Sequence, residues 1–131
     1  MAEEKPKRKK ILIIEDDSFL SGMYASRFNL EGFEVFIAED GEKGFNMIQE
    51  KNPDLILLDV ILPRWDGFEV LQKIKKDPSY RNIPVLLLTN LGQEEDIKRG
   101  KALGADDYLV KVHHTPDEVV SKVRSFVSRG N

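Results

Sequence analysis

Five polar side chains in this sequence each stand at the carboxyl end of a short apolar run. They are Glu15, Asp16, Asp59, Thr89 and Lys111. Brought together, they would supply three carboxylates, one hydroxyl and one ammonium group. Carboxylates that cluster repel one another, and their pKa values rise unless a cation lies among them. The set therefore indicates a cation site, provided that the fold gathers these residues.

The available ligand types favour a hard cation and phosphoryl chemistry. The chain has no cysteine, and its two histidines, His113 and His114, are adjacent, so oxygen ligands dominate. Mg²⁺ prefers oxygen and binds one or two carboxylates together with phosphate oxygens and water. One carboxylate can then attack phosphorus while Mg²⁺ and Lys111 neutralise the phosphoryl oxygens, with Thr89 as a neutral donor.

Alternating apolar runs and amphipathic segments must position these residues. Short runs rich in Ile, Leu and Val predict strands at 11–14, 33–38, 55–58, 83–88 and 107–110. Helical spacing and capping signals predict helices that begin near 18, 41, 67, 93 and 116. Strands that are apolar nearly throughout are typical of a parallel sheet covered by helices on both faces.

The predicted fold class is therefore α/β, with a doubly wound, flavodoxin-like sheet of five parallel strands in the order 2-1-3-4-5. In such a sheet the carboxyl ends of all strands lie on one edge, and ligands bind there. For any one of the five polar residues, a role as a cap or turn residue would be a sufficient explanation. Their joint occurrence on four of the five strand ends favours a common site.

Length and composition predict one domain at 10–131, preceded by a flexible basic tail at 1–9. The net charge of −3 gives no signal for direct contact with nucleic acid, and no apolar run is long enough to span a membrane. The lack of cysteine makes a reducing cytoplasm the simplest compartment.

The order and spacing of the motifs resemble the response-regulator receiver domain of two-component signalling, the CheY-like family, over about residues 10–128. The matching stretches are ILIIEDD at 11–17, DVILPRWDG at 59–67, LLLT at 86–89 and GADDYLVK at 104–111. Together they are highly specific, whereas each alone would be weak.

The resemblance implies that Asp59 is the phosphoacceptor, taking phosphate from a phosphohistidine on a sensor histidine kinase or phosphotransfer protein. It implies that Asp16 and Asp59 ligate Mg²⁺ with the backbone carbonyl of Ile61, while Glu15 acts through water. Lys111 would pair with the phosphoryl group. Such a domain is a regulatory switch rather than an enzyme.

The resemblance also implies a switch made of Thr89 and Tyr108. Thr89 would move to hydrogen-bond the phosphoryl group, which lets the Tyr108 ring swing inward and alters the surface of the fourth helix, fifth strand and fifth helix. That surface would control a downstream protein. The charged face of the fourth helix suits either such a partner or a homodimer.

Several positions depart from the usual family pattern. Val112 replaces a proline that normally follows the lysine through a cis bond, and we expect a trans bond at this position. Asn90 replaces a small residue and is expected to cap the next helix or else to crowd the phosphoryl position. Ile61 and Leu91 flank the path of attacking water and cannot orient it, so we expect slow self-dephosphorylation. Trp65 is expected to pack under its loop.

The adjacent histidines, His113 and His114, are expected to be solvated loop residues rather than metal ligands. The main alternative function is a pseudo-receiver that binds proteins without accepting phosphate. A haloacid-dehalogenase-like phosphatase would need an aspartate at position 61 and its nucleophile after the first strand. A flavin binder would need a Ser/Thr/Gly-rich loop where residues 15–17 are acidic.

Overall fold

The computed structural model describes residues 8–128 of the chain, so residues 1–7 of the predicted tail lie outside the described part. Within it, the strands are β1 (Lys10–Ile14), β2 (Glu34–Ala38), β3 (Leu55–Leu58), β4 (Val85–Thr89) and β5 (Asp107–Val110). The helices are α1 (Ser18–Leu30), α2 (Gly41–Lys51), α3 (Gly67–Lys76), α4 (Glu94–Ala102), the 3₁₀ turn η1 (Lys111–His113) and α5 (Pro116–Ser128). The strands form one parallel sheet in the order β2-β1-β3-β4-β5, as predicted.

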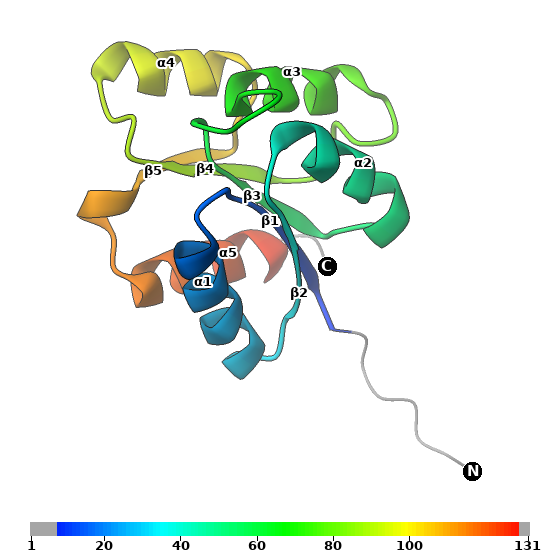
Figure 1. Cartoon of the computed structure of the whole chain (residues 1–131), viewed down its shortest axis with the longest axis vertical. Helices are drawn as coiled ribbons and strands as arrows, with labels where there is room; N and C mark the ends of the chain where they lie inside the picture. The colour runs from blue at the N-terminus through cyan, green and yellow to red at the C-terminus, as the bar shows by residue number, and fades with distance from the viewer. Residues whose placement is uncertain (1–7, 129–131) are drawn as a thin grey trace.

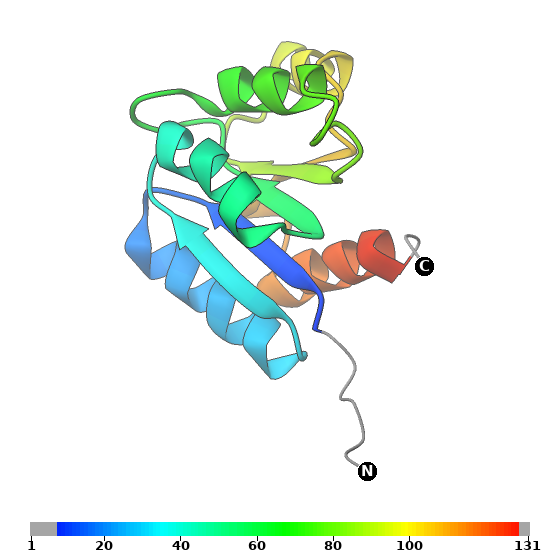
Figure 2. The ribbon, with the colours of Figure 1, turned by 90° about the vertical axis from the view of Figure 1, so that its right-hand side faces the viewer.

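The sheet separates two layers of helices (Figure 1). Helices α1 and α5 cover one face, and α2, α3 and α4 cover the other, which the turned view of Figure 2 also shows. Successive side chains of a strand point to opposite faces, so each strand contributes to two cores. Ile11 and Ile13 pack against α1 and α5, whereas Leu12 and Ile14 pack in the core that includes α2 and α3 residues.

Local capping signals set several helix starts. The Asp66 carboxylate accepts the Glu69 amide at 3.0 Å at the start of α3, as the sequence predicts. Thr115 and Glu118 form the predicted reciprocal capping box ahead of α5, with distances of 2.8 and 3.2 Å. Such caps satisfy amide groups that lack a partner within the helix.

Two local predictions are wrong, and one element was missed. The fourth strand runs over Val85–Thr89 rather than 83–88, because its pairing starts where Ile56 of β3 lies opposite Val85. Asn90 does not cap α4, whose N-cap is Gln93. The 3₁₀ turn η1 after β5 was not predicted.

Candidate functional site

The carboxyl edge of the sheet brings Glu15 and Asp59 together. The Asp59 amide donates to the Ile14 carbonyl at 3.0 Å, and the Glu15 amide donates to the Ala38 carbonyl at 3.0 Å. These bonds continue the β1–β3 and β1–β2 pairing one residue beyond the strands. Both side chains are buried, so their position follows from backbone pairing rather than from a flexible loop.

Lys111 links the two buried carboxylates. Its Nζ lies 2.5 Å from Oε1 of Glu15 and 2.8 Å from Oδ2 of Asp59, and all three side chains are largely buried. Burial lowers the pKa of Lys111, but its hydrogen bonds with Asp59 and Glu15 outweigh burial and leave the pKa above its ordinary value. Burial raises the pKa of Glu15, which the hydrogen bond from Lys111 partly offsets. The direct pair of Lys111 with Glu15 was not predicted from the sequence.

Glu15, Asp16 and Asp59 form an acidic cluster with the geometry of a cation site. One ligand atom from each of the three lies within 4.8 Å of the others, and Asp16 is exposed while Glu15 and Asp59 are buried. A cluster of oxygen ligands that is exposed to water on one side suits Mg²⁺, because this ion retains several of its water ligands when it binds to proteins. The donor set therefore fits this ion. His113 and His114 belong to no such cluster among residues 8–128.

The loop between β3 and α3 begins just after Asp59, and its two ends pack closely backbone to backbone. The Gly67 amide donates to the Val60 carbonyl at 2.8 Å, and a Cβ on Gly67 would collide with the Asp59 carbonyl. Trp65 packs on Phe45 with ring centroids 6.0 Å apart, which confirms its predicted packing role. The Ile61 amide donates to Oδ1 of Asp59 at 3.2 Å, so this loop also orients the carboxylate.

Thr89 and Tyr108 are both tied to the backbone of Leu91. Thr89 is fully buried, and its hydroxyl accepts the Leu91 amide at 3.3 Å. The Tyr108 ring is turned inward, and its hydroxyl donates to the Leu91 carbonyl. Burial, followed by the negative charges of Asp96 and Asp59, raises the pKa of Tyr108 to about 12. Sequence reasoning missed Leu91 as the shared anchor because its role rests on backbone atoms.

The segment after β5 differs in part from expectation. The peptide bond between Lys111 and Val112 is trans, as predicted, and every peptide bond in the described part of the chain is trans. His113 is exposed as expected. The prediction for His114 is wrong, because its ring is half-buried and Nδ1 lies 3.0 Å from the Val110 carbonyl.

A family profile described as the response regulator receiver domain matches residues 11–124. The chain belongs to this family. The receiver domain is 42% identical over 120 residues to the DNA-binding dual master transcriptional regulator RpaA of Synechocystis sp., covering 92% of this chain and 49% of that protein. It is 37% identical over 121 residues to the phosphate regulon transcriptional regulatory protein PhoB of Escherichia coli, covering 92% and 52%. The receiver domain thus spans about half the length of these relatives.

Solved structures agree with the receiver-domain fold. The receiver domain of the Francisella response regulator 1452 superposes with a TM-score of 0.87 at 29% identity, covering 95% of this chain and all of that one. A CheY-like receiver domain protein of Methanospirillum hungatei gives a TM-score of 0.87 at 27% identity, covering 94% and 96%. The chain is therefore a receiver domain of a two-component response regulator, and such domains are regulatory.

No helix among residues 8–128 is long and apolar enough to cross a bilayer.

Proposed function

We propose that Asp59 accepts a phosphoryl group from a phosphohistidine on a sensor histidine kinase or phosphotransfer protein. The observation that carries this proposal is the buried Asp59 carboxylate, which lies beside Glu15 and Lys111. The third carboxylate of the cluster, Asp16, is exposed, so the cluster is accessible from solvent on that side. A carboxylate oxygen of Asp59 forms the new bond to phosphorus as the bond from phosphorus to the imidazole nitrogen breaks. The imidazole leaves as the neutral ring after taking a proton.

The other residues of the cluster have separate roles in this transfer. Asp16, Asp59 and the Ile61 carbonyl would hold Mg²⁺, with Glu15 acting through water, and the ion would neutralise charge on the phosphoryl oxygens. Lys111 already contacts Oδ2 of Asp59, so a short movement would place its ammonium group on a phosphoryl oxygen. The Thr89 hydroxyl accepts from the Leu91 amide and so still has its proton to donate to the same group.

Incubation with acetyl phosphate and Mg²⁺, followed by intact mass measurement, tests the proposal. We expect one phosphoryl group per chain, lost when the metal is removed with a chelator before the phosphodonor is added. A chain that gains no phosphate under these conditions would instead favour a pseudo-receiver that binds its partner without phosphorylation.

Three exposed apolar side chains, called here the apolar rim, follow strands whose carboxyl ends lie at the edge of the sheet that carries the acidic cluster. Phe19, Ile61 and Val112 follow β1, β3 and β5 and are 79%, 59% and 75% exposed. Exposed apolar side chains that gather on one surface mark protein–protein interaction sites. We propose that this apolar rim contacts the phosphodonor protein.

Changing Phe19 to serine should slow transfer from the kinase or phosphotransfer protein that phosphorylates the wild type. Burial of one large apolar side chain contributes about 1.5–3 kcal/mol, so we expect at least an approximately ten-fold loss in the transfer rate. Phosphorylation by acetyl phosphate should stay unchanged, because it needs no protein contact. Leu30→Ser is the matched control, since Leu30 is 77% exposed at the other end of α1. Equal effects of the two variants would contradict the proposed contact.

The phosphorylated state should be long-lived. Ile61 is exposed beside Asp59, and neither it nor Leu91 carries a side-chain group that can orient a water molecule. Ile61→Asn should therefore shorten the lifetime of the acyl phosphate several-fold, measured as its decay after removal of the phosphodonor. Val112→Asn, on a different loop of the rim, serves as the control. A lifetime of seconds in the wild type, unchanged by Ile61→Asn, would show that this explanation is wrong.

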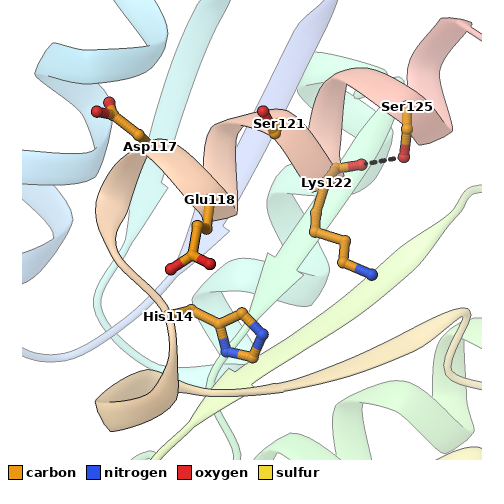
Figure 3. A pocket seen from close by; sticks show the side chains of 6 residues that line it. All are labelled: His114, Asp117, Glu118, Ser121, Lys122 and Ser125. Atoms are coloured by element: carbon orange, nitrogen blue, oxygen red, sulfur yellow. Dashed lines mark hydrogen bonds between the residues drawn. The ribbon is translucent and has the colours of Figure 1, made fainter.

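We propose that output passes through the surface of α4, β5 and α5. A groove of about 500 Å³ lies along α5 on this surface (Figure 3), lined by His114, Asp117, Glu118, Ser121, Lys122 and Ser125. Lys122 of α5 pairs with Asp107 of β5 at 3.4 Å. The charged side chains of Asp117, Glu118 and Lys122 at this groove suit a protein partner or a second copy of the chain, and sedimentation of the phosphorylated protein separates these two cases.

A further inference from the structure

A glycine of helix α4, Gly100, packs against the ring of Tyr108, the proposed switch residue. Gly100 is the one buried residue of α4 in the part of the chain that the structure describes. A methyl group placed on Gly100 would lie 2.8 Å from Cδ2 and 3.0 Å from Cε2 of Tyr108, and 2.7 Å from Cδ1 of Leu87. Carbon atoms pack at about 3.5–4.0 Å, so the Tyr108 ring occupies space that any other residue at position 100 would need.

Of the two neighbours, Tyr108 is the one that can move. Leu87 is 0% exposed and lies in register between Leu58 of β3 and Tyr108 of β5, so the core encloses it. Tyr108 lies on β5, at the edge of the sheet, and a single hydrogen bond to the Leu91 carbonyl ties its hydroxyl. Rotation of Tyr108 would move the whole ring toward solvent, whereas Leu87 can only shift its terminal Cδ1 methyl group within the core.

The helix itself is held at the end where Gly100 lies. The Gly100 carbonyl accepts the Ala105 amide at 3.0 Å, and the next residue, Asp106, donates its amide to the Val85 carbonyl of β4 at 2.8 Å. The Arg99 guanidinium lies 4.4 Å from the ring centroid of Phe68 in α3. Moving α4 away from the sheet to make room for a methyl group would disturb all of these contacts. Turning the Tyr108 ring outward would break only the hydrogen bond from its hydroxyl to the Leu91 carbonyl.

We propose that Gly100 is a positioning residue for Tyr108, and that the absence of its side chain is what allows the inward ring. The glycine is unfavourable within a helix relative to alanine, which a packing role explains. The consequence for signalling rests on the proposed function: an outward ring would uncouple Thr89 from the surface of α4, β5 and α5. The effect of Gly100 on the position of the Tyr108 ring does not depend on phosphorylation.

The test compares Gly100→Ala with Gly22→Ala in the unphosphorylated chain. Gly22 lies within α1, and a methyl group there would contact nothing within 4 Å, so it is a matched control for alanine in a helix. The readout is the ionisation of Tyr108, followed by NMR of ring-labelled tyrosine and assigned with Tyr108→Phe. We expect the midpoint to fall from about 12 toward about 10 in Gly100→Ala and to stay unchanged in Gly22→Ala.

A midpoint unchanged in folded Gly100→Ala would overturn the proposal. A double-mutant cycle covers the case in which Gly100→Ala is too unstable to titrate. In a Tyr108→Ala background, Gly100→Ala should lose a large part of its destabilising effect, measured by urea unfolding, because the ring is no longer there and only the contact with Cδ1 of Leu87 remains. The same loss of stability in both backgrounds would also overturn the proposal. Because all these measurements use unphosphorylated protein, failure of Asp59 to accept phosphate would refute the proposed function without affecting this result.

Discussion

Asp59→Asn is expected to abolish incorporation of phosphate from acetyl phosphate in the presence of Mg²⁺ while leaving the chain folded. An amide is neutral and a poor nucleophile, so no acyl phosphate can form at position 59. The asparagine oxygen can still accept the Ile61 amide, and Lys111 keeps its contact with Glu15. Intact mass after incubation measures the loss directly.

The control for this substitution is Asp54→Asn. Asp54 lies at the opposite end of β3, where its carboxylate accepts the Lys10 amide at 2.7 Å, and an asparagine can accept the same bond. This variant should gain one phosphoryl group like the wild type. A phosphate adduct that persists in Asp59→Asn would place the acceptor on another residue, with exposed Asp16 as the first candidate to examine.

Lys111→Met is expected to lower the free energy of unfolding by about 3 kcal/mol at neutral pH, the low end of the range for breaking a buried ion pair. Glu15 and Asp59 would remain buried without their shared cation, and the exposed Asp16 side lets some water reach them. The same change should strongly slow phosphorylation, because the phosphoryl group loses its cationic partner. Urea unfolding measures the first effect and acetyl phosphate labelling the second.

The stability loss in Lys111→Met should grow with pH. Burial already raises the pKa of Glu15, and the lysine hydrogen bond that lowers it would be gone, so the folded-state pKa of Glu15 rises further above 4.5. A carboxyl group with a raised folded-state pKa favours the folded state while it is protonated. That contribution is lost as the pH rises from 4.5 through the folded-state value, because ionisation then favours the unfolded chain.

Added Mg²⁺ should restore part of the stability of Lys111→Met, since the ion supplies a cation to the same carboxylates and binds only the folded state. Lys98→Met is the control, because Lys98 is exposed and pairs with exposed Glu94 one helical turn away. It should change stability by less than about 0.5 kcal/mol. A loss in Lys111→Met that is independent of both pH and Mg²⁺ would contradict the assignment of Lys111 as the internal cation of this cluster.

Local sequence was sufficient to predict most elements of this receiver domain. The run at 55–58 is wholly apolar, and the structure buries all of it in β3. Thr115, Pro116 and Glu118 indicate a helix start by local hydrogen bonding, and α5 begins there. The errors fall where pairing with a distant segment decides the outcome, as at the start of β4, where Val85 pairs with Ile56.

The sequence by itself determined the fold and which polar side chains reach the carboxyl edge of the sheet, because strand periodicity and right-handed crossovers leave few arrangements. Only the tertiary structure decided which of those side chains touch. Lys111 pairs with a carboxylate 96 positions earlier, Tyr108 donates to a backbone carbonyl, and Gly100 leaves space for a ring. Contacts of this kind depend on side-chain direction and on distances of a few tenths of an ångström, which residue type and spacing do not encode.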